Sequence, residues 1–329
     1  METLILNRSD IKALVTLDEI VTAVKDAFVQ KSEGKVQMPA KNFLFFKNYQ
    51  GDLRSMPSYL EGSDIAAVKI VNSHPENRAK GIPSVMGVTV LVSPETGAPL
   101  CIMDATLLTA LRTGAASCIA TDLLARKEAH IFGMVGAGAQ AQAQLEAIVK
   151  VRDIKYMKVF DRVISRAKEF TSHMSQIFGS IHIEVATTVA DAVKGSDIVT
   201  TITPTKAPIV MDAWVEEGVH INAVGADAPG KQELDPKILK RAKVVVDDLE
   251  QASHGGEINV PISSGIMNAG DVYAEIGDLI TGKKSARTSD KEITMFDSTG
   301  LAIQDAASAA AVYKKALQRK VGLLLDFLD

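Results

Sequence analysis

The sequence predicts an α/β protein with two domains, the first built on a mostly antiparallel sheet and the second on a doubly wound parallel sheet. Three observations lead to this prediction. The chain has 329 residues, about twice the length of a typical single domain. Residues 1–112 contain strand-like runs separated by turn residues. From residue 113 onward, short apolar strands alternate with amphipathic helices, which is typical of a parallel sheet covered on both faces.

The composition is that of an ordinary globular protein and limits the possible functions. Hydrophobic residues make up 47% of the chain and charged residues 23%, which excludes a disordered protein. The formal net charge of -4 gives no electrostatic reason to expect a nucleic-acid or membrane partner. The cysteines, Cys101 and Cys118, form no CxxC pair, so we expect a reducing compartment. We also expect no bilayer-spanning run and no signal peptide, and hence a cytoplasmic protein.

The elements of the first domain follow one another closely. The sequence Thr16-Leu17-Asp18-Glu19 opens a helix that ends near Gly34. Strands are expected at 42–46, 52–59, 65–72, 85–92 and 100–103. The turn sequence at 93–97 joins the last two strands as a hairpin. Such short connections predict antiparallel pairing.

The second domain alternates strands and helices. A helix is expected at 140–151 and a longer one ends near residue 178, whereas strands are expected at 129–135, 156–160, 181–185, 197–202, 220–224, 243–247 and 292–296. The alanine-rich run 301–317 predicts a final helix that returns to the first domain. We therefore assign residues 1–112 and 305–329 to the first domain, and residues 113–304 to the second.

A glycine-rich turn is the clearest local motif. Gly136-Ala137-Gly138-Ala139-Gln140-Ala141 reads G-x-G-x-x-A between an expected strand and an expected helix. The first glycine permits the tight turn, the second lets the backbone approach a pyrophosphate, and the small Ala141 lets helix and strand pack closely. The helix N-terminus would then face the phosphates. This pattern favours a Rossmann-type dinucleotide site over an ordinary surface turn.

An acidic residue at the end of the next expected strand indicates which dinucleotide binds. Asp161 stands 25 residues after Gly136, where a carboxylate accepts hydrogen bonds from ribose hydroxyls and repels a 2′-phosphate. The pattern therefore favours NAD over NADP. Arg162 keeps NADP open as the alternative, because a guanidinium pairs with a 2′-phosphate.

Cationic residues of the first domain are the candidates for substrate chemistry. Lys69 shares a strand face with Ile65, Ala67 and Val71, and desolvation there lowers the pKa of an ammonium toward that of a general acid/base. An edge-strand lysine that reaches water is the alternative. Arg112 lies in an apolar segment and needs a partner, either a ligand or an internal carboxylate.

Asp227 follows an expected strand end, where ligands bind in parallel sheets, although aspartate is also a common turn residue. Arg54 alone would be assigned to the surface. His74 and His254 match no zinc spacing, so no metal is expected.

Taken together, the chain resembles the ornithine cyclodeaminase/mu-crystallin family over nearly its whole length. Six motifs occur in the family's order: GDLRSMP at 51–57, KIVNSHP at 69–75, MDAT at 103–106 with LRTGAA at 111–116, GAGAQA at 136–141, GADAPGKQEL at 225–234 and FDSTG at 296–300. Within the family, VDDLEQA at 246–252 and HGGEIN at 254–259 are most similar to the archaeal-type alanine dehydrogenase branch.

The resemblance implies a homodimer in which the first domain supplies substrate contacts and the dimer interface. It also implies that Arg54 and Lys69 reach the substrate, that Arg112 lies near its carboxylate, and that Asp227 acts in catalysis across from Lys69. The residues that it implies around the cofactor are Ser84, Arg112, Gly136, Gly138, Ala139, Gln140, Asp161, Thr201, Thr203, Val224, Gly225, Ala226, Lys231 and Ser298.

The activity expected from this resemblance is the reversible, NAD-dependent oxidative deamination of L-alanine to pyruvate and ammonia, with Lys69 as the acid/base. Ornithine or lysine cyclodeamination with catalytic NAD is the first alternative. Reduction of a cyclic imine such as pyrroline-2-carboxylate, with NADH or NADPH, is the second. A non-catalytic cofactor binder remains a further alternative, although the combination of Lys69, Arg54 and Asp227 argues against it.

Overall fold

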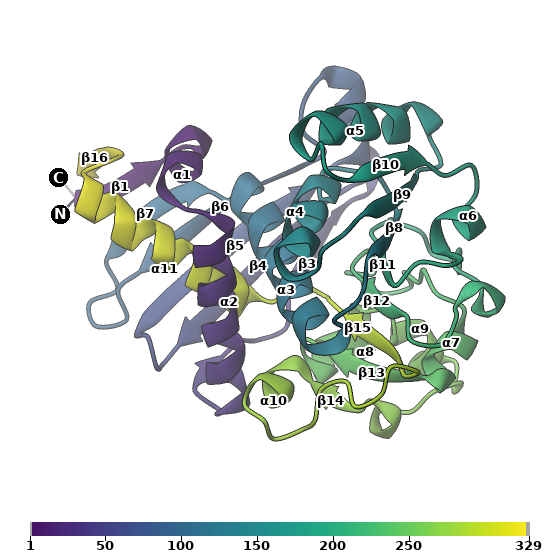
Figure 1. The fold of residues 1–329 in the computed structure, drawn as a ribbon. Helices are drawn as coiled ribbons and strands as arrows, with labels where there is room; N and C mark the ends of the chain where they lie inside the picture. Colours follow the sequence, from purple (N-terminus) through teal and green to yellow (C-terminus); the bar gives the residue numbers. More distant parts are fainter. Residues whose placement is uncertain (1, 327–329) are drawn as a thin grey trace. The chain divides into compact units, whose positions relative to one another are not determined.

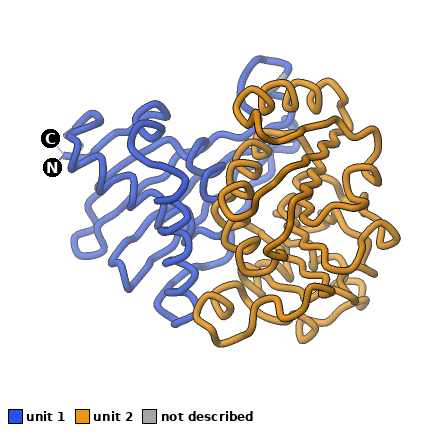
Figure 2. Tube along the Cα trace, in the orientation of Figure 1, with its two compact units in different colours: residues 1–112, 301–329 blue, residues 113–300 orange. Residues whose placement is uncertain are grey.

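Two eight-stranded sheets organise the chain in the computed structural model, which describes residues 2–326 (Figure 1). They lie in separate units, one made of Met1–Arg112 with Leu301–Asp329 and the other of Thr113–Gly300 (Figure 2). One sheet is mostly antiparallel and the other parallel, which confirms the predicted fold class. Residues 327–329, which the sequence analysis assigned to the first domain, lie outside the described residues.

The first unit is a sheet with the strand order β16-β1-β7-β6-β5-β4-β2, in which β3 also pairs with β4. Its strands are β1 (Glu2–Leu6), β2 (Val36–Gln37), β3 (Asn42–Phe46), β4 (Gly51–Leu60), β5 (Ile65–Ser73), β6 (Val85–Val92), β7 (Pro99–Asp104) and β16 (Leu323–Asp326). The predicted hairpin is confirmed, since β6 and β7 are antiparallel and Gly97 N donates to Ser93 O at the turn. The outer strands β1 and β16 were not predicted, and β1 pairs with β7 in parallel.

The helices of the first unit are α1 (Arg8–Leu14), α2 (Leu17–Ser32) and α11 (Ala302–Arg319). The predicted start of α2 is confirmed, because Glu19 Oε2 accepts the Thr16 backbone N–H at 2.9 Å in a capping box. Helix α11 packs against α2 and across β4, β5 and β6 (Figure 1). This return of the C-terminal helix brings polar residues of α11 onto the face of the sheet that holds Lys69.

The second unit has a parallel sheet with the strand order β10-β9-β8-β11-β12-β15-β13-β14. Its strands are β8 (Ile131–Val135), β9 (Tyr156–Phe160), β10 (His182–Val185), β11 (Ile198–Thr201), β12 (His220–Ala223), β13 (Ala242–Val246), β14 (Ala274–Glu275) and β15 (Ile293–Asp297). Its helices are α4 (Ala141–Val151), α5 (Ile164–Ile177), α6 (Val189–Val193), α7 (Pro236–Arg241), α8 (Leu249–Gly255), α9 (Asn259–Ser263) and α10 (Ile276–Ile280). The strand order reverses its direction between β8 and β11, where ligands bind in such sheets.

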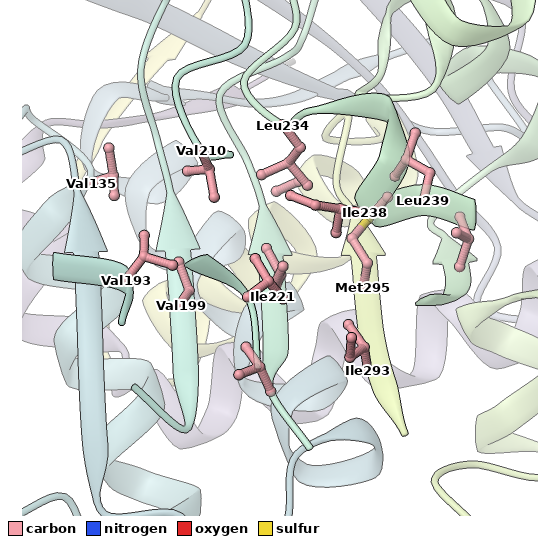
Figure 3. Close-up of a cluster of buried hydrophobic side chains, with 14 of the residues drawn as sticks. Val135, Val193, Val199, Val210, Ile221, Leu234, Ile238, Leu239, Ile293 and Met295 are labelled. Atoms are coloured by element: carbon pink, nitrogen blue, oxygen red, sulfur yellow. The ribbon is translucent and has the colours of Figure 1, made fainter. Parts of the chain in front are cut away.

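The strands of the second unit are apolar because the parallel sheet has buried side chains on both faces. One cluster joins Val135, Val199, Ile221 and Met295 from four strands, and helix α7 adds Ile238 to it (Figure 3). A second cluster joins Phe132 of β8 to Leu145 and Ile148 of α4. These clusters hold the strands in register, so that their carboxyl ends meet at one edge.

Helix α3 (Thr106–Leu124) corrects one expectation from the sequence. From the sequence we expect no apolar run of bilayer-spanning length, but this helix of 19 residues is long and apolar enough to meet that criterion. The helix is apolar because it is a core helix: 72% of its apolar window is buried inside the protein. The division between the two units falls within this helix, after Arg112.

We expect that Ile148→Ala lowers the free energy of unfolding by about 2–5 kcal/mol, because its side chain is 0% exposed and the substitution leaves a cavity. The matched control is Ile177→Ala, at a helical isoleucine of the same unit that is 50% exposed; its cost should stay below about 1 kcal/mol. Urea unfolding of both variants measures the difference. Equal losses of stability would contradict the assignment of Ile148 to the core.

Candidate functional site

Lys69 is a fully buried lysine on an inner strand of the first unit. It lies on β5, opposite Met56 of β4 and Thr89 of β6. The predicted alternation is confirmed, since Ala67 and Val71 on the same face are buried as well. Only 1% of the Lys69 side chain is exposed, so the alternative of an edge-strand lysine that reaches water is wrong. A buried ammonium of this kind requires a partner.

That partner is Asp305 in the first turn of α11. Its Oδ2 lies 2.6 Å from Lys69 Nζ, and its Oδ1 accepts a hydrogen bond from Arg112 Nε at 3.0 Å. The neighbouring Gln304 accepts a second bond from the same guanidinium, Nη1 to Oε1, at 3.0 Å. Arg112 therefore has the internal carboxylate that the sequence analysis left open as one alternative. The two cations and the carboxylate form one buried cluster, which we call the charged triad.

The charged triad tunes the proton affinity of Lys69. Burial, followed by the positive charge of Arg112, lowers the pKa of Lys69 to about 7, whereas the Asp305 carboxylate acts in the opposite direction. Lys41 adds a small lowering effect. A lysine with a pKa of about 7 exchanges a proton readily at neutral pH, as a general acid/base requires.

Arg54 lies on the same sheet face as the charged triad. It is opposite Val71 in the pairing of β4 with β5, so it is a diagonal neighbour of Lys69. Its Nε donates to Asp52 Oδ1 at 3.0 Å, and its guanidinium carbon lies 5.3 Å from the centre of the Phe43 ring. The side chain is 13% exposed, so the assignment to the surface from local sequence alone is wrong.

The glycine-rich turn of the second unit lies at the point where the strand order reverses. Gly136 follows β8 with a φ of 114°, a conformation that L side chains rarely adopt. A Cβ at Gly136 would lie 2.7 Å from the carbonyl oxygen of Ile202, directly after β11. The turn therefore requires glycine, and the expected cofactor residues Gly138, Ala139 and Gln140 lead from it into α4.

Asp161 follows β9 and supports the glycine-rich turn. Its Oδ2 accepts the backbone N–H of Ala137 at 2.9 Å, and its Oδ1 accepts that of Val163 at 2.8 Å. The carboxylate is thus fixed beside the fingerprint. Each of its oxygens retains a lone pair for a ribose hydroxyl.

The other expected cofactor residues of this unit follow neighbouring strands. Thr201 ends β11; the remaining ones come directly after β11, β12 and β15 and comprise Thr203, Val224, Gly225, Ala226 and Ser298. The carboxyl ends of parallel strands thus gather them at one sheet edge. Asp227 and Lys231 lie in the loop after β12 and form an ion pair with each other. Ser84 belongs to the first unit, where its carbonyl oxygen accepts the His74 N–H at 2.7 Å.

The residues at this edge fit a dinucleotide. Gln140 Oε1 and Ser298 Oγ are buried and have no hydrogen-bond partner within the part of the chain that the structure describes. A buried oxygen without a partner is costly, and a bound group with hydroxyl or amide donors would satisfy both. Together with the glycine turn and Asp161, these oxygens are consistent with an NAD site.

Sequence reasoning missed Asp305 and Glu233. Glu233 is fully buried, and its carboxylate accepts the Thr203 N–H and hydroxyl, each at 2.7 Å, and the Gly225 N–H at 2.9 Å. It therefore joins the loops after β11 and β12. Burial raises the pKa of Glu233 to about 7, and burial beside Glu233 raises that of Glu257. Asp305 offered one signal, a carboxylate inside the alanine-rich run of α11, whereas Glu233 offered none, because it stands among the polar residues of the segment 230–235.

Comparisons with known proteins agree over the whole chain. The model of the ornithine cyclodeaminase/mu-crystallin family matches residues 1–320. The alanine dehydrogenase of Archaeoglobus fulgidus is 51% identical over 327 residues, which cover 99% of both chains. A solved archaeal alanine dehydrogenase dimer with bound NAD has a TM-score of 0.94 and 51% identity, with all of both chains covered. The Δ1-pyrroline-2-carboxylate reductase of Thermococcus litoralis, solved with NADH and L-proline, has a TM-score of 0.94 and 40% identity, with 98% of this chain and 99% of that chain covered.

We expect that Gly136→Ala weakens NAD binding by about tenfold or more, because the added methyl group meets the Ile202 carbonyl and the backbone must leave its positive φ. Gly179→Ala is the matched control, since a Cβ there meets nothing within 4 Å. Fluorescence titration with NADH measures both affinities. Unchanged affinity in Gly136→Ala would show that the turn does not contact the cofactor.

Proposed function

The chain belongs to the ornithine cyclodeaminase/mu-crystallin family, and on this basis we propose that it catalyses the reversible, NAD-dependent oxidative deamination of L-alanine to pyruvate and ammonia. The observation that carries the proposal is the 51% sequence identity with the Archaeoglobus fulgidus alanine dehydrogenase over 99% of both chains. The buried Lys69 supports it, because its pKa of about 7 suits a proton-transfer role at neutral pH.

The second unit would hold the cofactor. Gly136, Gly138 and the start of α4 would face the pyrophosphate, and Asp161 the ribose. Gln140 Oε1 and Ser298 Oγ would find their missing donors there. When bound, NAD supplies the acceptor for the hydride that leaves the substrate Cα. The carboxylate at Asp161 favours NAD over NADP.

The cations of the first unit would bind the substrate carboxylate. Asp305 and Gln304 occupy Nε and Nη1 of Arg112, and neither contact uses Nη2. That nitrogen would therefore meet the carboxylate, together with Arg54 on the same sheet face. A fixed carboxylate orients the Cα–H bond toward the hydride acceptor, and this orientation lowers the activation barrier for hydride transfer.

Lys69 would move the protons. In its neutral form it accepts the proton that water releases as it adds to the imine carbon. In its ammonium form it returns that proton to the nitrogen. As the C–N bond breaks and ammonia leaves, the neutral Lys69 accepts the hydroxyl proton of the tetrahedral carbon, and the carbonyl group of pyruvate forms. Asp227 would balance the positive charge on the substrate nitrogen.

We infer that the protein acts as a homodimer in the cytoplasm. The dimeric state of the related NAD-bound structure supports the assembly. The acidic net charge of -4 and the paucity of cysteines support an intracellular enzyme without a nucleic-acid partner.

The proposed substrate is tested with purified protein, NAD and one amino acid at a time. L-alanine should give steady growth of NADH absorbance, because dehydrogenation leaves the reduced cofactor in solution. Ammonia release from L-ornithine or L-lysine without NADH growth would instead establish a cyclodeaminase. Oxidation of NADH in the presence of pyrroline-2-carboxylate, without NADH formation from alanine, would establish the imine reductase.

We expect that Lys69→Ala lowers kcat for alanine by about 100-fold to 10,000-fold, the usual contribution of a positioned acid/base. NADH affinity should stay close to wild type, since the cofactor residues of the second unit are untouched. Lys35→Ala is the matched control, because the Lys35 side chain is 56% exposed. Near-normal turnover in Lys69→Ala would refute the assignment of proton transfer to this residue.

A further inference from the structure

Asp305 is the central residue of the charged triad, although it has no place in the reaction derived above. We propose that Asp305 is a positioning residue: its carboxylate orients Lys69 and Arg112 together and compensates one of their two charges. This inference rests on the proposed function, because it concerns how the proton-transfer lysine is held and charged.

The geometry gives each oxygen of the Asp305 carboxylate a separate cation. Oδ2 lies 2.6 Å from Lys69 Nζ, and Oδ1 lies 3.0 Å from Arg112 Nε. The three residues come from different elements, β5, α3 and α11. One carboxylate therefore fixes the ammonium of a strand relative to the guanidinium of a helix.

The carboxylate is itself held in place by its helix. Asp305 lies in the first turn of α11, where the helix dipole stabilises a negative charge. The preceding Gln304 accepts the Leu301 N–H at 3.2 Å while it binds Arg112. The start of α11 thus presents neighbouring acceptors to the same guanidinium.

Burial makes the charge balance decisive. The side chains of Lys69, Arg112 and Asp305 are only 1%, 7% and 3% exposed. The charged groups that act on Lys69 are Arg112 and Lys41, which disfavour its ammonium, and Asp305, which favours it. Without Asp305, the positive charges of Lys69 and Arg112 would remain in a low-dielectric site without its carboxylate to balance them. Lysine releases its proton under such conditions and arginine does not.

The test is the pH dependence of kcat/KM for alanine in Asp305→Asn. Proton acceptance by Lys69 should make the wild-type value rise through pH 7, the approximate pKa of this lysine. Loss of the carboxylate should move that rise to lower pH by about 1–3 units and lower kcat, while NADH affinity stays unchanged. Asp153→Asn, at an exposed aspartate with 67% side-chain exposure, should leave the profile as it is.

Asp305→Glu separates charge from position. It keeps the negative charge, so the rise should stay near pH 7. The longer side chain displaces Lys69 Nζ, so kcat should still fall. An unchanged profile and normal turnover in Asp305→Asn would overturn the proposal.

A second measurement is independent of activity and of the proposed reaction. Because the pKa of Lys69 is about 7 in the folded protein and near 10.5 when unfolded, the unfolded state binds more protons between these values. Lys69 therefore makes unfolding less favourable as pH rises through this window. Urea unfolding at a series of pH values gives the free energy of unfolding of wild type and of Lys69→Met. The pH at which the difference between them begins to rise marks the lower end of this window, which is the pKa of Lys69 in the folded protein.

The same comparison between Asp305→Asn and the double variant Asp305→Asn/Lys69→Met should place the lower end of the window at a lower pH. An identical lower end in both backgrounds would overturn the proposal even if the enzyme acts on another substrate. A shifted lower end without alanine oxidation would instead refute only the proposed function.

Discussion

Burial of two cations, Lys69 on a strand and Arg112 on a helix, around one carboxylate is the constraint on which the first unit depends. Lys69 and Arg112 are almost without solvent contact, and a buried cation is tolerated only beside an anion or a strong acceptor. The anion comes from the other end of the chain, on α11. The chain must therefore return to its first sheet after it has completed the second unit, which explains why the first unit is discontinuous in sequence.

The second unit solves a different problem, the assembly of a ligand site from loops that are distant in sequence. Parallel strands place their carboxyl ends at one edge, and Glu233 joins the loops after β11 and β12 through its buried carboxylate. Gly136 completes the arrangement, because only glycine allows the turn after β8 to approach the end of β11. The backbone is thus held rigidly at the positions where a dinucleotide needs close approach.

The sequence predicted the elements whose signal is local, and missed those that depend on partners. The strand at 42–46 and the strand at 85–92 have the predicted bounds, because each is a short, nearly continuous apolar run. The short strands β1 and β16 depend on pairing with strands distant in sequence, β1 with β7 and β16 with β1, and were missed. Lys69 was found as an isolated charge on an apolar face, whereas Asp305 was not. An acid among alanines resembles a solvent-facing helical position until α11 is packed against the sheet.

The role proposed for the charged triad does not depend on the side chain of the substrate. Alanine and proline both carry a carboxylate beside a carbon–nitrogen bond, and the cations of the first unit are suited to the carboxylate that they have in common. Hydride transfer at that carbon and proton transfer at the adjacent nitrogen are needed in either case. Discrimination between the methyl group of alanine and the ring of proline must then come from apolar side chains around the Cα substituent. Each methylene group contributes about 1–3 kcal/mol to such discrimination. Under the proposed function, the choice of substrate would therefore depend on side chains other than Lys69, Arg112 and Asp305.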